Sequence, residues 1–271
     1  MNLQEFVGGG KKLEEKDYEE AALALGCEVA AVKAVSEVES SGSGFLRDNR
    51  PKILFESRWF SNLTGHQYDG SNPDISTRKW VRNYKGGARE YGRLEKAMKL
   101  NREAALKATS WGYFQILGVN YKLAGFANVE DFVKAHVRSE GEHLKAFVNF
   151  VKAKKIDDEL RDLRWADFAR IYNGPGYKKN RYDTKMADAY ERYSSGVIRP
   201  STLDVQQALI KHGYSLDADG ITGPKTRAAI MDFQSANGLV ADGIAGPNTL
   251  EALGLFEVAD PIAIAKHVSE D

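Results

Sequence analysis

Apolar residues recur at intervals of three and four along most of the chain, which is the spacing of amphipathic helices. Alternation of apolar and polar residues is scarce, and Lys52-Ile53-Leu54-Phe55 is the best strand candidate. The pattern predicts an all-α fold with at most a short β-hairpin near 50–60. The expected helices cover residues 18–25, 28–39, 88–106, 129–154 and 184–194.

One carboxylate interrupts the apolar stripe of the helix expected over 28–39. Glu39 follows Val35 by four residues and Val32 by seven, so the three side chains share a face, whereas Glu37 points away from it. Burial against valines disfavours the charged form and raises the pKa of a carboxyl group. A carboxyl group that stays protonated at neutral pH can donate its proton to a leaving oxygen, as a glycosidase acid must.

The position of Glu39 is suggestive only in combination with other segments. The helix is expected to stop at 40–44, where serines and glycines place Glu39 beside a turn. Taken alone, a glutamate in the last turn of an amphipathic helix is more often a border residue. Residues 108–116 and 171–177 change that balance, because both put aromatic and amide side chains next to glycine turns that can face a ligand.

These segments resemble those of a known family. The stretch from Val38 to Phe45, Ser-x-Gly-x-x-Gln-Ile at 110–116 and Tyr-Asn-Gly at 172–174 look like the goose-type and lytic-transglycosylase branch of the lysozyme superfamily. Together with Arg-Pro-Lys-Ile-Leu-Phe-Glu at 50–56, the first of them resembles the N-acetylmuramidase domain of bacteriophage endolysins. The resemblance covers roughly residues 15 to 195 and implies a lysozyme-like helical catalytic domain.

The same resemblance implies roles for individual residues. Glu39 matches the catalytic acid, Asp48 matches an aspartate that acts as base or positions water, and Thr64 matches a threonine that helps to hold the water. The resemblance and the nine-residue offset of the two carboxylates favour inversion. The residues expected to bind the sugar chain are Ser110, Tyr113, Gln115, Tyr172 and Asn173.

Two of the acidic residues also allow a structural interpretation. Asp48 lies in the polar stretch 47–51, where a turn aspartate paired with a neighbouring arginine is equally plausible without the resemblance. Glu56 follows the apolar run of the strand candidate and is more easily interpreted as a structural carboxylate bonded to arginine or backbone groups.

The C-terminal part contains an internal repeat. Asp-Gly-Ile-Thr-Gly-Pro-Lys-Thr at 219–226 returns after 23 residues as Asp-Gly-Ile-Ala-Gly-Pro-Asn-Thr at 242–249. Asp-Gly favours a turn and Pro suits the first position of a helix, so each repeat predicts a turn followed by a helix. The pattern resembles the three-helix peptidoglycan-binding module appended to many cell-wall hydrolases, here over roughly 201–255. Individual ligand contacts do not follow from it.

Length and charge fit two domains. A chain of 271 residues with 42% hydrophobic residues can form one medium and one small core. The stretch 194–201 is the natural linker, and we place the catalytic domain at 1–197 and the wall-binding domain at 198–271. Residues 201–271 hold 4 basic and 10 acidic residues, a net charge of −6, which leaves +6 on residues 1–200. A basic catalytic part would be attracted to an anionic cell wall.

The cysteine and the histidines give no sign of a disulfide or a metal site. The single cysteine, Cys27, excludes an internal disulfide and is expected to be a packed or turn residue. His136 and His143 are seven residues apart, and two helix-surface histidines are more common at this spacing than a zinc pair. The chain has no His-Glu-x-x-His frame, and we expect neither a metal nor a cofactor.

These observations predict an enzyme that hydrolyses the β-1,4 bond between N-acetylmuramic acid and N-acetylglucosamine. Peptidoglycan is the expected partner, and we expect a monomer that binds no nucleic acid and has no membrane segment or signal peptide. For a phage endolysin, the family implies residence in the host cytoplasm until holin-dependent release. Two alternatives stay open: a lytic transglycosylase that forms 1,6-anhydro products, and a non-enzymatic wall-binding protein of a virion.

Overall fold

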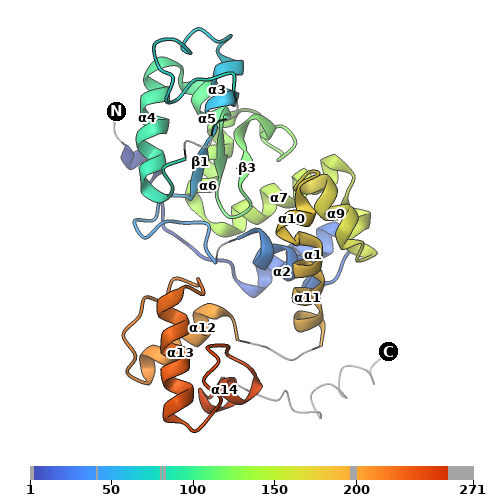
Figure 1. The fold of residues 1–271 in the computed structure, drawn as a ribbon. Helices are drawn as coiled ribbons and strands as arrows, with labels where there is room; N and C mark the ends of the chain where they lie inside the picture. The colour runs from blue at the N-terminus through green and yellow to red at the C-terminus, as the bar shows by residue number, and fades with distance from the viewer. Residues whose placement is uncertain (1–2, 41, 80, 82–83, 196–199, 256–271) are drawn as a thin grey trace. The chain divides into compact units, whose positions relative to one another are not determined.

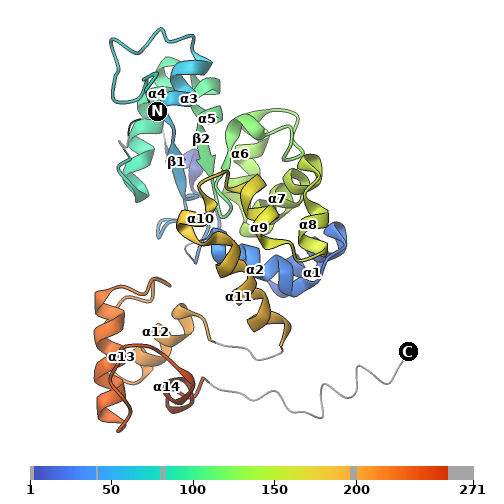
Figure 2. The same ribbon diagram turned by 45° about the vertical axis from the view of Figure 1, so that its right-hand side comes forward.

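The chain folds into two compact units, residues 1–187 and 188–271 (Figures 1 and 2). The structure is a computed structural model that describes residues 3–40, 42–79, 81, 84–195 and 200–255. The predicted helical fold is confirmed, and the division between the units falls within α11, Tyr182–Ser194. In the described part of the chain, no helix is both long enough and apolar enough to cross a membrane.

The first unit is a set of short helices around one small sheet. Three of the expected helices appear with adjusted ends, as α1 (Glu15–Leu25), α2 (Val29–Glu39) and α11. The remaining helical elements of this unit are η1 (Leu3–Phe6), α3 (Ser57–Leu63), η2 (Gly87–Arg89), α4 (Glu90–Leu100), α5 (Arg102–Lys107), η3 (Gly118–Asn120), α6 (Val129–Arg138), α7 (Glu140–Lys154), α8 (Asp157–Arg161), α9 (Trp165–Tyr172) and α10 (Tyr177–Asn180).

The two longest predicted helices are each broken in two, which corrects the prediction. Asn101 separates α4 from α5, and Ser139 separates α6 from α7. Both have extended backbones, and both side chains accept a hydrogen bond from the backbone N–H three residues later, at 2.9 Å and 3.2 Å. A side chain that caps a new helix compensates for the lost backbone bond, so a continuous apolar spacing does not guarantee a continuous helix.

The strand at 53–55 is confirmed, but the hairpin near 50–60 is not. β1 (Ile53–Phe55) pairs antiparallel with β2 (Thr109–Trp111), more than fifty residues away, and β2 pairs with β3 (Ile116–Leu117). The residues after β1 form α3 instead. The tight connection lies between β2 and β3. The hairpin turn therefore falls within 108–116, the segment predicted to face a ligand.

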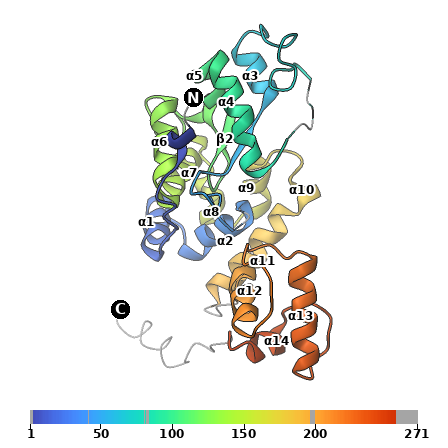
Figure 3. The same ribbon diagram turned by 90° about the vertical axis from the view of Figure 1, so that its left-hand side faces the viewer.

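The core of this unit joins the sheet to helices on several sides. α4 packs along β1, and α1 lies against both α2 and α7 (Figure 3). Trp111, Phe132 and Phe147 are fully buried, as are Val32 and Val35 on the inner face of α2. Burial of each valine side chain stabilises the fold by roughly 1.5 to 3 kcal/mol. The last turn of α2, which carries Glu39, is thereby held on the body of the unit.

The second unit repeats one small motif. After the end of α11, its described residues form α12 (Thr202–Lys211), α13 (Pro224–Ala236) and α14 (Pro247–Ala252), and a proline begins each of the last two. The predicted order of turn and then helix is confirmed in both repeats. The core of this unit contains Leu209, Ile230, Phe233 and Leu250.

Candidate functional site

Glu39 opens onto a hollow of about 320 Å³ in the first unit. The hollow is formed by the end of α2, the loop after it, β1, the start of η2 and the β2–β3 turn. Its lining residues are Glu39, Ser43, Leu46, Lys52, Ile53, Leu54, Gly86, Gly87, Gly112, Tyr113 and Gln115. We call this hollow the cleft.

The environment of Glu39 is the one that its sequence position predicted. It is partly buried above the valines of α2, whereas Glu37, two residues earlier, is exposed. Burial raises the pKa of the Glu39 carboxyl group to about 7, against the effect of a hydrogen bond that Asn173 donates to it. Glu39 therefore keeps a proton on a substantial fraction of molecules at neutral pH, which a general acid requires.

Asn173 and Tyr172, at the end of α9, lie beside Glu39. The Nδ2 group of Asn173 donates to Oε1 of Glu39 at 2.9 Å, and its buried Oδ1 has no hydrogen-bond partner among the described residues. The Tyr172 hydroxyl donates to the carbonyl of Phe114 at 3.1 Å, and its ring stacks on Phe168. Burial, and then the charge of Glu39, raise the pKa of Tyr172. Of the two residues predicted to bind sugar, Asn173 therefore contacts Glu39 directly, and Tyr172 lies close enough for the charge of Glu39 to act on it.

The β2–β3 turn brings Tyr113 and Gln115 into the cleft. Gln115 has a left-handed backbone, with φ of 49°, and its Nε2 donates to the carbonyl of Gly112 at 2.7 Å. That bond closes the turn and presents both side chains to the hollow. Ser110 is different, because it is buried within β2 opposite Leu54 and Leu117 and does not line the cleft.

Asp48 and Thr64 do not line the cleft either. Asp48 is half exposed in the turn before β1 and binds the Arg50 guanidinium at 2.6 Å and 3.0 Å, which lowers the pKa of Asp48. Thr64 is buried at the end of α3, where its hydroxyl donates to the carbonyl of Phe60 at 2.8 Å. The roles assigned to these two residues stay predictions.

Several residues of the cleft were not singled out from the sequence, and Lys52 is the most distinctive of them. It precedes β1 and is half-buried; burial, and then the nearby charge of Lys12, lower the pKa of its ammonium group. Alternation along 52–55 carried a signal, since Ile53 and Phe55 are buried and Lys52 shares the other face with Leu54.

Glu56 was expected to be a structural carboxylate bonded to arginine or backbone groups, and Glu90 makes bonds of this kind. Glu56 accepts a hydrogen bond from the Tyr84 hydroxyl at 3.0 Å. Glu90, which is fully buried, accepts from the Arg93 guanidinium and from the backbone N–H groups of Phe55 and Gly86, each at 3.0 to 3.2 Å. Glu90 therefore fixes the Gly86 side of the cleft.

The interpretation of His136 and His143 as helix-surface residues was wrong. Both are buried, and their rings stack with centroids 4.7 Å apart. Nε2 of His143 donates to the carbonyl of His136 at 2.6 Å, and its Nδ1 accepts from the backbone of Tyr113. Within the described ranges, no group of three or more His, Cys, Asp or Glu side chains could hold a metal ion. Cys27 is half-buried, and burial raises the pKa of its thiol to about 11.

Comparisons with known proteins agree with this geometry. Residues 28–194 match the family model of N-acetylmuramidase, and residues 199–253 match that of a peptidoglycan binding domain. Among solved structures, the chain is similar to the crystal structure of the Burkholderia AP3 phage endolysin, with 43% sequence identity and a TM-score of 0.66 over 69% of this chain and 73% of that one. A comparison with curated proteins gave no match. The chain belongs to the N-acetylmuramidase family of glycoside hydrolases and carries a C-terminal peptidoglycan-binding domain.

Proposed function

We propose that this chain is a phage endolysin that cleaves the β-1,4 bond between C1 of N-acetylmuramic acid and O4 of N-acetylglucosamine, with Glu39 as the acid. The observation that carries the proposal is a carboxyl group whose pKa is raised to about 7 at the edge of an open cleft. The Glu39 proton passes to the glycosidic oxygen as the C1–O bond breaks, and water supplies the hydroxyl group at C1. The product is a new reducing end on N-acetylmuramic acid.

Asp48 is the proposed base for the attacking water. The Arg50 guanidinium lowers the pKa of Asp48, so this carboxylate is ionised at the pH at which Glu39 still holds a proton. A pair of carboxyl groups whose environments push their pKa values apart is the usual arrangement for acid and base roles. Thr64 would hold the same water, and attack from the side opposite the leaving group would invert the configuration at C1.

The remaining predicted contacts differ in their proposed roles. Tyr113 and Gln115 line the cleft and are placed to contact the sugar rings. Asn173, with Tyr172 packed beside it, instead orients Glu39. A protonated Glu39 has a hydroxyl donor, and turning the Asn173 amide over would let Oδ1 accept from it. Ser110 supports the turn from within β2.

The second unit is the proposed wall anchor. We place the boundary between the catalytic domain and the wall-binding domain at 197/198. A variant that lacks residues 201–271 should cut soluble glycan fragments at close to the full rate but attack intact wall more slowly. Because 201–271 carries −6, its binding to an anionic wall should depend little on salt. Release by salt would contradict specific recognition.

The experiment that tests the proposed reaction is mass spectrometry of digested peptidoglycan. Hydrolysis yields reducing muropeptides, whereas a lytic transglycosylase yields 1,6-anhydro products that lack one water. The family match favours the first outcome, and anhydro products would remove the roles proposed for Asp48 and Thr64. A preparation with no lytic activity would instead support a wall-binding virion protein. The enzyme is proposed to act as a monomer, without nucleic acid, after holin-dependent release from the host cytoplasm.

A further inference from the structure

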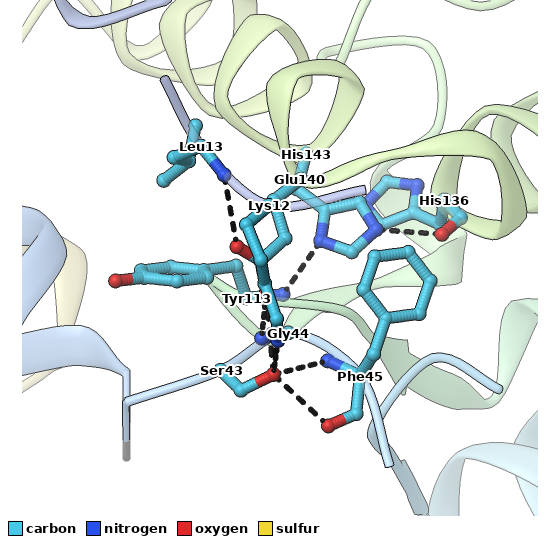
Figure 4. A network of polar contacts seen from close by, with 9 residues as sticks. All are labelled: Lys12, Leu13, Ser43, Gly44, Phe45, Tyr113, His136, Glu140 and His143. Atoms are coloured by element: carbon cyan, nitrogen blue, oxygen red, sulfur yellow. Dashed lines mark hydrogen bonds and ion pairs between the residues drawn. The ribbon is translucent and has the colours of Figure 1, made fainter. Parts of the chain in front are cut away.

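Another buried glutamate, Glu140, is the first residue of α7. The Glu140 side chain is 3% exposed, and its Oε1 accepts hydrogen bonds from the Gly44 backbone at 2.7 Å, Lys12 Nζ at 3.2 Å and Ser43 Oγ at 3.3 Å (Figure 4). Its Oε2 accepts from the Leu13 backbone at 3.1 Å. One carboxylate thus ties the loop that follows the catalytic helix to a segment near the N-terminus.

One turn further along α7, His143 holds the β2–β3 turn, which forms another side of the cleft. Its Nδ1 accepts from the backbone N–H of Tyr113 at 3.1 Å. The ring also leaves no space beside Gly44 and Gly112, where an added Cβ would lie 2.6 Å and 2.8 Å from Nδ1. Burial lowers the pKa of His143 to about 4, so the neutral ring keeps its acceptor at neutral pH. The loop after α2 and the β2–β3 turn therefore meet on one buried helix end.

Three residues held in this way line the cleft with Glu39, namely Ser43, Gly112 and Tyr113. The N-terminal segment takes part as well, since the Glu140 N–H donates to the carbonyl of Lys11 at 2.9 Å and Lys12 also bonds Ser43. This segment precedes residue 28, where the match to the family model begins. The electrostatic effect extends to Lys52 in the cleft, because the charges of Lys12 and Glu140 act on its pKa in opposite directions.

We propose that Glu140 is a positioning residue for the catalytic acid, and that Lys12 and Leu13 complete the support of the cleft from outside the family's matched region. Glu140 holds the Ser43–Gly44 loop closed beside Glu39 and thereby keeps water away from that carboxyl group. The proposal rests on the hydrolytic function proposed above. It assigns Glu140 no contact with the substrate.

The negative charge of Glu140 matters as well as its shape. Both oxygens accept from backbone N–H groups, of Gly44 and of Leu13. A glutamine has only one carbonyl oxygen, so its NH₂ group would face one of these donors and leave a buried N–H unpaired. Lys12 would at the same time lose the carboxylate that neutralises its ammonium group. Glu140→Gln is therefore expected to loosen the loop without creating a cavity.

The test compares pH–rate profiles of purified full-length variants on soluble glycan fragments. In Glu140→Gln, kcat should fall between about 10- and 100-fold with little change in KM, since a displacement of this size affects the acid more than sugar binding. The basic limb of the profile, which reports deprotonation of Glu39, should move to lower pH because water now reaches that carboxyl. Among the described residues, Asn173 bonds Glu39, the charge of Glu39 acts on Tyr172 and Tyr182, and the titratable side chains that share its cleft are Lys52 and Tyr113; none of these is substituted.

Two further variants make the test decisive. Lys12→Met, at a side chain 58% exposed, should shift the basic limb in the same direction by a smaller amount, and Lys12→Arg should restore it. Glu142→Gln is the matched control, because Glu142 is on the same helix turn but pairs with Arg138 and Lys145. Lys12→Met also keeps the proposal testable if Glu140→Gln does not fold.

The outcomes separate this proposal from the proposed function. If the wild type releases no reducing muropeptides, the hydrolytic function fails whatever the variants do. If the wild type is active but Glu140→Gln and Lys12→Met keep its basic limb, Glu140 does not position the acid. A lower melting temperature with an unshifted limb would likewise overturn the proposal, because it reports a structural role alone.

Discussion

The two units bury polar side chains in opposite ways. In the second unit, Gln206 donates to Asp219, Ile221 and Thr226 and accepts from Gly220, all between 2.7 and 3.1 Å. Gln234 repeats the arrangement with Asp242, Ile244, Thr249 and Gly243. In the first unit, Glu39 is a carboxyl group that receives a bond from Asn173 and has its pKa raised by burial.

The different hydrogen bonding of the buried glutamines and of Glu39 distinguishes a structural role from a chemical one. A neutral amide with its donors and acceptors paired costs little to bury and fixes a loop in one conformation. A carboxyl group that is desolvated without compensation retains a proton to transfer. Glu90 and Glu140 lie between these cases, since both are carboxylates but are surrounded by N–H donors. Buried charge alone therefore does not identify a catalytic residue, and its hydrogen bonds must be examined as well.

The largest expected effect comes from removing the acidic proton of Glu39. Glu39→Gln keeps the shape of the side chain but has no proton to give, so lytic activity should fall 100-fold or more while the fold is retained. Turbidity loss of permeabilised cells measures the rate. Glu37→Gln is the control, two residues away on the exposed face, and should change little. A near-normal rate in Glu39→Gln would remove Glu39 as the acid.

A smaller loss is expected at Asp48, the carboxylate that an arginine keeps ionised. Asp48→Asn should reduce the hydrolytic rate by roughly 100-fold if this group accepts the proton of water. Asp74→Asn is a matched control, because Asp74 is an exposed aspartate paired with Lys96 elsewhere on the same unit. Equal and mild effects of the two variants on muropeptide release would mean that Asp48 is only a turn residue.

In the second unit, the same kind of change should affect stability and leave chemistry alone. Gln206→Leu removes the acceptor of the Gly220 N–H and the amide donor that bonds Asp219 and Thr226, so it should destabilise this unit by roughly 3 to 5 kcal/mol. Limited proteolysis and pelleting with purified wall would detect the loss. The four tryptophans of the chain, at 59, 80, 111 and 165, all belong to residues 1–187, so tryptophan fluorescence should be unchanged. Gln207→Leu is the control, because Gln207 is the neighbouring residue on the exposed face of the same helix.

The smallest effect is a gain in stability when Glu39 is replaced. Its pKa is about 7 in the folded protein against 4.5 when unperturbed, so its contribution to stability is complete below about pH 4.5 and is lost as pH rises through 7. Glu39→Gln avoids that loss and should be more stable than the wild type by about 2 kcal/mol above pH 7, allowing for the partial exposure of the group. Thermal unfolding at pH 4 and pH 8 measures it. A variant no more stable at pH 8 would show that Glu39 is well solvated.

Local features of the sequence were sufficient to place several residues of the candidate site. The spacing of Glu39 from Val32 and Val35 placed it on the buried face of one helix, because helical periodicity is a property of neighbouring residues. The prolines at 224 and 247 marked the starts of two helices for the same local reason. The family motifs added which segments would belong to one cleft, and Tyr113 and Gln115 were found in it.

Tertiary structure decided the contacts between residues far apart in the chain. Asn173 reaches Glu39 across 134 positions, β1 pairs with a strand beyond α5, and Glu140 joins the loop after α2 to the N-terminal segment. No local pattern distinguishes Glu140 from Glu142, or a buried pair of histidines from two exposed ones. Their burial depends on which surfaces pack together, and that is settled by the whole core. Sequence spacing singled out Glu39 as the proposed acid, and packing determined the pKa of its carboxyl group and its partners.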